Sequence, residues 1–221
     1  MKQNQDYKNE ALAALKGNWA PAVLACIVLF VVAGIIYGPN YVQSVSASLH
    51  GRNPAAGING LTFGTWLLSW LVFCPLAIGY YNAHRSLLAQ GDNRITQNMF
   101  NIGFGNWFHH VLGYFLMAFF IFLWSLLLLI PGIIKYYSYG LTQYILVERP
   151  ELSANQAIDE SRRLMRGHKF DLFYLDLSFI GWYLLTIFTL GIGMLWVMPY
   201  HYSARASFWE DIKANDPAWQ A

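Results

Sequence analysis

A continuous apolar stretch, residues 107–147, is about twice as long as one membrane crossing requires. A transmembrane helix needs about 20 apolar residues, because each residue adds about 1.5 Å along the helix axis. Pro131 and Gly132 interrupt the stretch. Proline removes a backbone donor and clashes with the preceding helical turn, and glycine readily adopts the dihedral angles of a tight reversal. The pattern therefore predicts a helical hairpin, with helices over residues 107–130 and 133–147 and a turn at Pro131 and Gly132.

Two further pairs of apolar runs fit the same plan. Residues 19–37 and 61–81 predict a first hairpin with a longer polar tip over residues 38–60. Residues 170–209 predict a third hairpin that reverses at Gly191 and Gly193. The sequence therefore predicts an all-α polytopic membrane protein. It has six transmembrane helices in three hairpins, within a single membrane domain over residues 1–221.

The composition agrees with a membrane protein. Of the 221 residues, 56% are hydrophobic and 12% are charged, whereas soluble domains carry about 25% charged residues. The net charge of +2 is too small to indicate a nucleic-acid partner. Both cysteines, Cys26 and Cys74, fall inside apolar runs, which favours inert thiols over the alternative of a disulfide or a metal site.

Lysine and arginine are distributed unevenly between the predicted loops. With the N-terminus in the cytoplasm, only Arg52 and Lys135 fall at the outer side. The cations that fall at the inner side are Lys2, Lys8, Lys16, Arg85, Arg94, Arg149, Arg162, Arg163, Arg166, Lys169, Arg205 and Lys213. Cytoplasmic loops carry the excess of lysine and arginine, so both termini are predicted to be cytoplasmic.

The three hairpins begin alike, which predicts a threefold internal repeat over residues 6–90, 94–150 and 153–212. The first, third and fifth spans follow Gly17, Gly105 and Gly167, each next to an asparagine or histidine. Amphipathic stretches over residues 6–16 and 153–166 precede the first and third of these glycines, and the second stretch begins with a predicted capping box, Ser153 with Gln156. The predicted unit is an interfacial helix, a glycine, a span, an outer turn and a returning span.

The returning helices carry small side chains that allow close helix approach. We expect these helices to meet at the centre of the bundle through Ala83, Ser86, Ser138, Gly140, Thr142, Ser203, Ala204, Ala206 and Ser207.

Several motifs of the C-terminal half resemble a bacterial integral-membrane family catalogued as domain of unknown function 975. They are the Pro131–Gly132 turn followed by Lys135, Tyr136 and Tyr137, the residues Ser161, Met165, Gly167 and Lys169, residues 177–182, and Pro199 with Tyr200. Residues 14–19 also fit, and the resemblance extends over residues 12–212, with a weak stretch at 42–59. It implies a bacterial inner-membrane protein, and the family brings no established activity.

Asp176 is the clearest ionisable residue inside a predicted span, and such residues are costly in a bilayer and often functional. In an antiparallel hairpin that reverses near Leu190, residues at equal depth have numbers that sum to about 380. Asp176 is then predicted near Ala204, within a turn of His201 and Arg205, and Asp171 near Trp209. This polar site can move protons or ions, or it can lock the third hairpin, and both interpretations stay open.

A basic cluster formed by Arg162, Arg163, Arg166 and Lys169 is predicted at the inner surface. Such clusters attract anionic headgroups. Lipid anchoring explains the cluster, and a phosphate-bearing ligand or a protein partner is the alternative.

The sequence contains none of the common hydrolase, P-loop or metalloprotease motifs. It therefore predicts a non-enzyme without cofactor or metal, in contact with membrane lipids, and with a second copy or another protein as a possible partner. Two functions from different classes remain. One is a small transporter or lipid-handling protein with a polar site near Asp176. The other is a non-transporting scaffold, stress or immunity factor.

Overall fold

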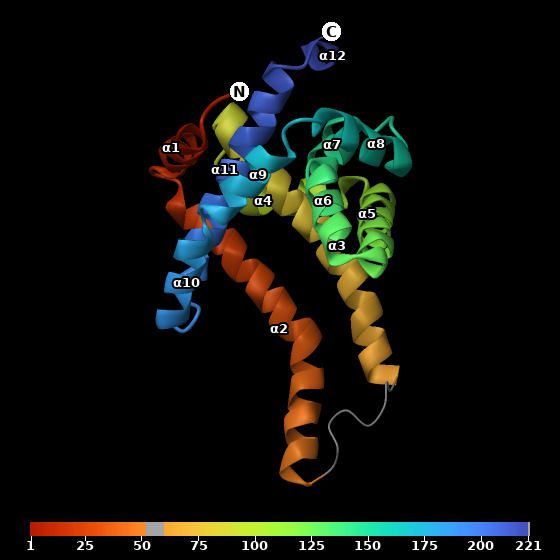
Figure 1. The fold of residues 1–221 in the computed structure, drawn as a ribbon. Helices are drawn as coiled ribbons and strands as arrows, with labels where there is room; N and C mark the ends of the chain where they lie inside the picture. The colour runs from red at the N-terminus through yellow and green to blue at the C-terminus, as the bar shows by residue number, and fades with distance from the viewer. Residues whose placement is uncertain (52–59, 221) are drawn as a thin grey trace.

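The computed structural model describes residues 1–51 and 60–220, and no strand occurs among them. Two long helices, α2 (Trp19–Leu49) and α3 (Gly60–Gln90), extend away from the end of the molecule that holds both termini (Figure 1). The other helices are α1 (Asn4–Leu15), α4 (Ile95–Gly105), α5 (Trp107–Leu127), α6 (Leu129–Ser138), α7 (Thr142–Glu148), α8 (Ala154–Leu164), α9 (Lys169–Leu177), α10 (Ile180–Phe188), α11 (Met194–Ala214) and α12 (Pro217–Gln220).

Within the described residues, four helical segments are long and apolar enough to cross a membrane. They are Trp19–Leu49, Phe63–Gln90, Trp107–Leu126 and Lys169–Phe188. They correspond to the first, second, third and fifth predicted spans. The all-helical fold and the membrane-spanning character are thus confirmed, whereas the fourth and sixth spans are not.

The middle hairpin differs from its prediction. The chain reverses at Leu128, which has extended dihedral angles (φ −163°, ψ 149°), and Pro131 and Gly132 lie in the first turn of α6. Proline is tolerated there because the first amides of a helix have no partner within the helix. A Cβ atom at Gly132 would collide with the side chain of Ser125, so this glycine serves the close packing of α5 on α6.

The returning half of this hairpin is not a continuous helix. The ten residues of α6 are followed by a break at residues 139–141 and by the seven residues of α7. Ten residues reach about 15 Å, half the thickness of the apolar bilayer core. As a consequence, Lys135 lines the same hollow as Arg162 of α8. The prediction that these two cations lie at opposite sides of the membrane is therefore wrong.

The first predicted tip also begins later than expected. Helix α2 continues past Tyr37 and through Pro39 as far as Leu49. The rest of the tip, including Arg52, lies outside the described residues.

The helix breaks occur at the three glycines. Gly17 (φ 83°) and Gly167 (φ 86°) separate α1 from α2 and α8 from α9, in the left-handed conformation that glycine adopts without cost. Gly105 ends α4 just before α5. The predicted capping box is present at the start of α8, where Ser153 accepts a hydrogen bond from the Gln156 amide and the Gln156 side chain accepts one from the Ser153 amide. The threefold repeat stays a prediction.

Helix α11 forms the centre of the core and packs against α1, α2, α3, α9 and α10. Phe208 and Trp209 of α11 are fully buried, and Trp209 stacks on Tyr144 of α7 with ring centroids 5.5 Å apart. The small residues that we expected at the centre are all buried. Their size explains how α11 lies so close to its neighbours.

Helices α3 and α4 touch backbone to backbone. A Cβ atom on Gly79 would collide with the carbonyl of Met99, and one on Gly103 would collide with the carbonyl of Pro75. Each helix thus presents a glycine to the backbone of the other, and α4 buries Ile95 and Met99 in the crossing.

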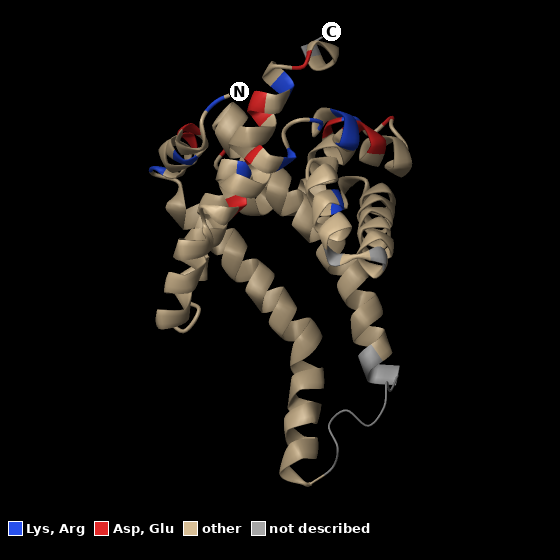
Figure 2. Ribbon diagram, in the orientation of Figure 1, with Lys and Arg blue, Asp and Glu red and all other residues tan. Residues whose placement is uncertain are grey.

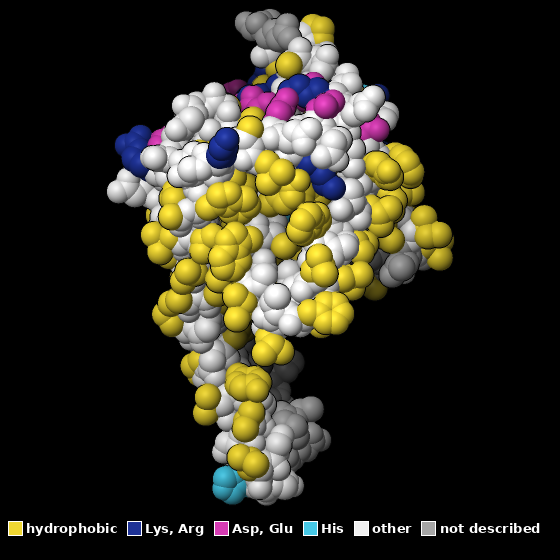
Figure 3. Space-filling view, turned by 90° about the vertical axis from the view of Figure 1, so that its left-hand side faces the viewer, with side chains coloured by type: hydrophobic (Ala, Val, Ile, Leu, Met, Phe, Trp, Pro, Cys, Tyr) yellow, Lys and Arg dark blue, Asp and Glu magenta, His cyan; other side chains and the backbone are white. Residues whose placement is uncertain are grey.

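Charged and apolar residues separate along the molecule. Lys, Arg, Asp and Glu gather at the end that holds both termini, whereas α2 carries none (Figure 2). Hydrophobic side chains cover the surface below this charged end (Figure 3). Such a surface suits lipid rather than water, and it places the protein in a membrane.

Candidate functional site

Asp176 contacts two basic side chains of α11. Its Oδ1 atom lies 2.8 Å from His201 Nε2 and 3.6 Å from Arg205 Nε. The three side chains are 15%, 12% and 6% exposed, so the pair of charges and the imidazole are largely sealed from the surface. The hairpin geometry brings them together, because α9 and α11 run antiparallel around the turn at Leu190 and Gly191, both of which have positive φ.

Tyrosines from three other helices complete this cluster. The hydroxyl of Tyr183 on α10 lies 2.8 Å from His201 Nδ1. Arg205 Nη1 donates to the hydroxyls of Tyr81 on α3, at 3.4 Å, and Tyr136 on α6, at 3.5 Å. Five helices therefore converge on the three residues. We call Asp176, His201, Arg205 and these three tyrosines the polar cluster.

Sequence reasoning missed the tyrosines of the polar cluster. A signal was present, because tyrosines recur before the small residues of each returning helix, as at Tyr80 and Tyr81. A tyrosine carries its hydroxyl at the end of a long apolar ring, so it can satisfy a buried charge from a neighbouring helix. Which tyrosine does so depends on helix rotation, which the sequence does not specify.

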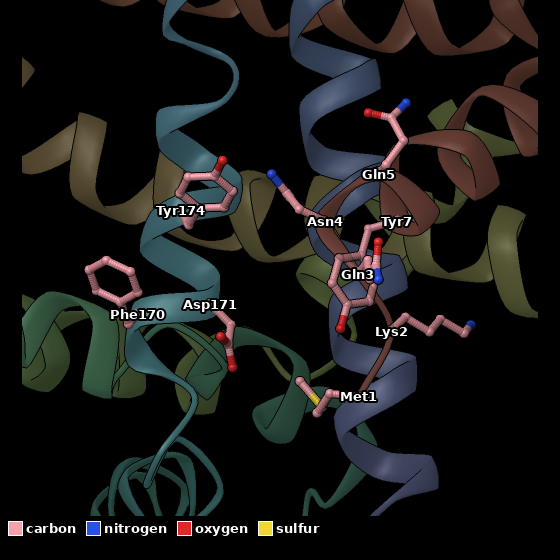
Figure 4. A pocket seen from close by; sticks show the side chains of 9 residues that line it. All are labelled: Met1, Lys2, Gln3, Asn4, Gln5, Tyr7, Phe170, Asp171 and Tyr174. Carbon is pink, nitrogen blue, oxygen red and sulfur yellow. The ribbon is translucent and has the colours of Figure 1, made fainter.

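Asp171 contacts none of the side chains of the polar cluster among the described interactions, and its position beside Trp209 stays a prediction. It lies on the first turn of α9, where its carboxylate contacts His168 Nδ1 at 3.1 Å. It also faces a hollow of about 500 Å³ between α1 and α9, together with Lys2, Asn4 and Tyr174 (Figure 4). Five residues separate Asp171 from Asp176, which places them on different faces of the helix.

The predicted basic cluster divides into paired and unpaired cations. Arg163 binds Glu160 at 2.7 Å and also Asp216 near the C-terminus, and its hydrogen bond to Glu160 lowers the pKa of that carboxyl. Arg162 binds Asp159 at 2.7 Å. Arg166 is exposed and Lys169 begins α9. Arg163 therefore joins α8 to the C-terminal segment through Asp216, whereas the pairs with Asp159 and Glu160 lie within α8.

A second ionic network, which sequence reasoning missed, joins α3, α7 and α11. Arg85 lies 2.9 Å from Glu148 and 2.8 Å from Glu210, and Lys213 lies 3.1 Å and 3.0 Å from the same two carboxylates. Each charge thus has two opposite partners. Glu148 also accepts a hydrogen bond from the indole of Trp209. Glu210 and Lys213 are three residues apart on α11, but Arg85 and Glu148 lie more than 60 residues from them and from each other, so no local periodicity marks the network.

Helix α1 attaches to α11 through polar contacts as well. The hydroxyl of Tyr7 donates to Asp211 at 2.7 Å, and burial, together with this hydrogen bond, raises the pKa of Tyr7. Glu10 of α1 accepts a hydrogen bond from Ser207. Helix α1 is therefore fixed to the central helix.

In the part of the chain that the structure describes, no group of three or more His, Cys, Asp or Glu side chains is arranged to hold a metal ion. Cys26 and Cys74 are both buried free thiols.

Comparison with known proteins gives one match. The model of a protein family described as "Protein of unknown function (DUF975)" matches residues 109–216. The matched segment contains α6 to α11 and hence Asp176, His201 and Arg205. No curated protein and no solved structure matches the chain.

Proposed function

Residues 109–216 belong to the family of unknown function DUF975, and from this premise we propose that the chain is a non-transporting scaffold of the bacterial inner membrane. Its charged end, with both termini, faces the cytoplasm and binds a protein partner or a second copy. The excess of lysine and arginine at this end supports the orientation. The three similar helix starts at Gly17, Gly105 and Gly167 support a threefold repeat as the plan of the scaffold.

The buried ion pair at the centre of the polar cluster is the observation that carries the proposal. Asp176 binds both His201 and Arg205, Tyr183 binds the second ring nitrogen of His201, and Arg205 Nη1 donates to the hydroxyl of Tyr81. A charge pair buried in this way joins helices, because removing one partner leaves the other uncompensated. The cluster therefore acts as a lock that joins α3, α6, α9, α10 and α11.

A second function has one observation in its favour. Tyr183, His201, Asp176, Arg205 and Tyr81 form a chain of polar contacts between 2.8 and 3.6 Å. Chains of titratable groups inside membrane proteins mark proton pathways. In a transporter or lipid-handling protein, this chain would carry protons or line a polar path.

Ion flux in liposomes separates the two functions. The purified protein and its Asp176→Asn variant are reconstituted with a pH-sensitive dye inside, and a potassium gradient with valinomycin supplies the driving voltage. For a scaffold, we expect proton flux equal to that of empty liposomes in both samples. A flux present in the wild type and absent from Asp176→Asn would replace the scaffold with the transport function.

A further inference from the structure

A hollow of about 380 Å³ lies between the spanning helix α5, the short helix α6 and the amphipathic helix α8. Its charged lining consists of two cations, Lys135 from α6 and Arg162 from α8, and one carboxylate, Asp159 from α8. Its wall includes the rings of Phe120 and Trp124 from α5. None of these residues belongs to the polar cluster.

The charges of the hollow are not balanced. Arg162 has a carboxylate partner, because its Nη1 atom lies 2.7 Å from Asp159 Oδ1. The ammonium of Lys135 instead lies over the ring of Trp124, 4.3 Å from its centroid. A ring face attracts a cation more weakly than an anion does. Lys135 and Arg162 line the same hollow, so an anion that enters it relieves repulsion between the two cations.

The remaining lining matches a phosphate group attached to a chain of apolar character. The side chains of Asn155 and Tyr139 supply polar groups, whereas Ile158 and the two rings of α5 supply an apolar wall. The hollow joins α8, which carries charged residues, to α5, which is long and apolar enough to cross the membrane. A site at this boundary lies at the depth of lipid headgroups. A volume of a few hundred Å³ is also typical of small-molecule sites.

We propose that this hollow binds the phosphate headgroup of an anionic phospholipid, with Lys135 and Arg162 as its cationic contacts and the rings of α5 beside the acyl chains. The break at residues 139–141 makes the site possible, because the short α6 brings Lys135 to the level of α8. The inference goes beyond the scaffold function and shares no residue with the cluster that carries it. Either can therefore fail without the other.

The test is a titration of the full-length protein in mild detergent with phosphatidylglycerol, with native mass spectrometry counting the bound lipids. A cation near an anionic headgroup contributes about a fivefold gain in binding. We expect Lys135→Gln and Arg162→Gln each to weaken retention of phosphatidylglycerol by about fivefold, with phosphatidylcholine retention unchanged. Asp159→Asn frees Arg162 and is expected to strengthen retention, a gain that misfolding cannot produce.

Arg166→Gln is the matched control, since Arg166 is exposed near the end of α8 and does not line the hollow. If Arg166→Gln and Lys135→Gln lose equal amounts of phosphatidylglycerol retention, the effect comes from unspecific surface charge. The proposed site is then wrong. Phosphatidylglycerol retention that is unchanged in both Lys135→Gln and Asp159→Asn would also contradict the proposed site. Saturable binding of inorganic phosphate without lipid, lost in Lys135→Gln, would assign the hollow to a soluble phosphate compound and overturn the lipid assignment.

Discussion

His201 engages both of its ring nitrogens, with Nε2 2.8 Å from Asp176 Oδ1 and Nδ1 2.8 Å from the hydroxyl of Tyr183. The imidazole of His201 thereby contacts both α9 and α10. These two helices are separated by a short interruption at residues 178–179. A ring held at both nitrogens has a defined orientation. This contact explains how two helices of nine residues each keep one position against α11.

The polar cluster predicts unequal effects for two substitutions at Asp176. Asp176→Asn retains the shape and much of the hydrogen bonding but leaves the charge of Arg205 uncompensated, so we expect a smaller loss in the free energy of unfolding than for Asp176→Leu. Asp176→Leu leaves His201 and Arg205 without their acceptor, and a loss of about 1–3 kcal/mol follows. Thermal midpoints in detergent measure both. Asp171→Leu, on the same helix and half exposed, is the control and should change stability by less than about 0.5 kcal/mol.

A different ranking would contradict the lock. If Asp176→Leu is as stable as the wild type, the Asp176 carboxylate does not stabilise the packing of α9 on α11. The scaffold proposal would then lose the observation on which it rests.

The crossing of α3 and α4 predicts that Gly79 tolerates no side chain. In Gly79→Ala, the new methyl group meets the carbonyl of Met99, and backbone atoms have to move apart. Such overpacking costs about 1–3 kcal/mol, which a thermal midpoint detects. Gly64→Ala on the same helix meets no atom within 4 Å and should be neutral or slightly stabilising, because alanine favours helix. Equal stability of the two variants would mean that the helices cross elsewhere.

Hydrophobic patterning predicted those elements that depend on local sequence. The long apolar helices and the breaks at Gly17 and Gly167 follow from composition and from backbone conformation. The contact of Asp176 with His201 followed from the depth relation within one hairpin. These features depend only on residues that are close in the sequence, or on two helices that are joined by one turn.

Two kinds of feature were not predicted: those that depend on the rotation of a helix about its axis, and those that depend on packing between segments far apart in the sequence. Apolar composition alone does not distinguish one span from the pair α6 and α7, because a break inside the protein can satisfy its backbone groups locally. Here the Leu141 amide donates to Ser161 of α8, whose hydroxyl donates to the carbonyl of Ser138. The network of Arg85 and Glu148 likewise joins three helices whose relative rotation the sequence leaves open.

The topology predicts where reporters become accessible. A cysteine placed after Gly51, at the far end of α2, should react with a membrane-impermeant maleimide from outside the cell. Cysteines placed after Gln90, Leu152 and the C-terminus should react only after the membrane is opened, because the proposed orientation puts the positively charged end in the cytoplasm. A background in which Cys26 and Cys74 are serines removes the native thiols. If the cysteine after Gly51 does not react with the maleimide in intact cells, the proposed orientation is wrong.

The attachment of α12 should weaken in acid. Arg163 holds the carboxyls of Glu160 and Asp216, and Trp219 of α12 donates to Glu160 at 3.1 Å. The Arg163 hydrogen bond lowers the pKa of Glu160 from 4.5. Burial acts to raise the pKa of Asp216, but hydrogen bonds from Arg163 and the Ala218 amide hold it below 3.8.

Groups whose pKa is lowered by folding contribute stability above their unfolded pKa and lose it as the pH falls through the folded pKa. We therefore expect α12 to be held at pH 6 and to be released progressively below about pH 4. Hydrogen exchange of residues 216–220, corrected for the intrinsic rate at each pH, measures this release. In Arg163→Gln the carboxyls lose the cation that binds them directly, and Arg149, which donates to the Ala218 carbonyl at 3.0 Å, remains; exchange at pH 6 should therefore be faster than in the wild type and should change less with pH. Arg166→Gln, which removes a charge outside this contact, should behave as the wild type. Protection of α12 that persists unchanged to pH 3 would show that the packing of Trp219 on Trp209, with ring centroids 5.1 Å apart, holds the helix without the ion pairs.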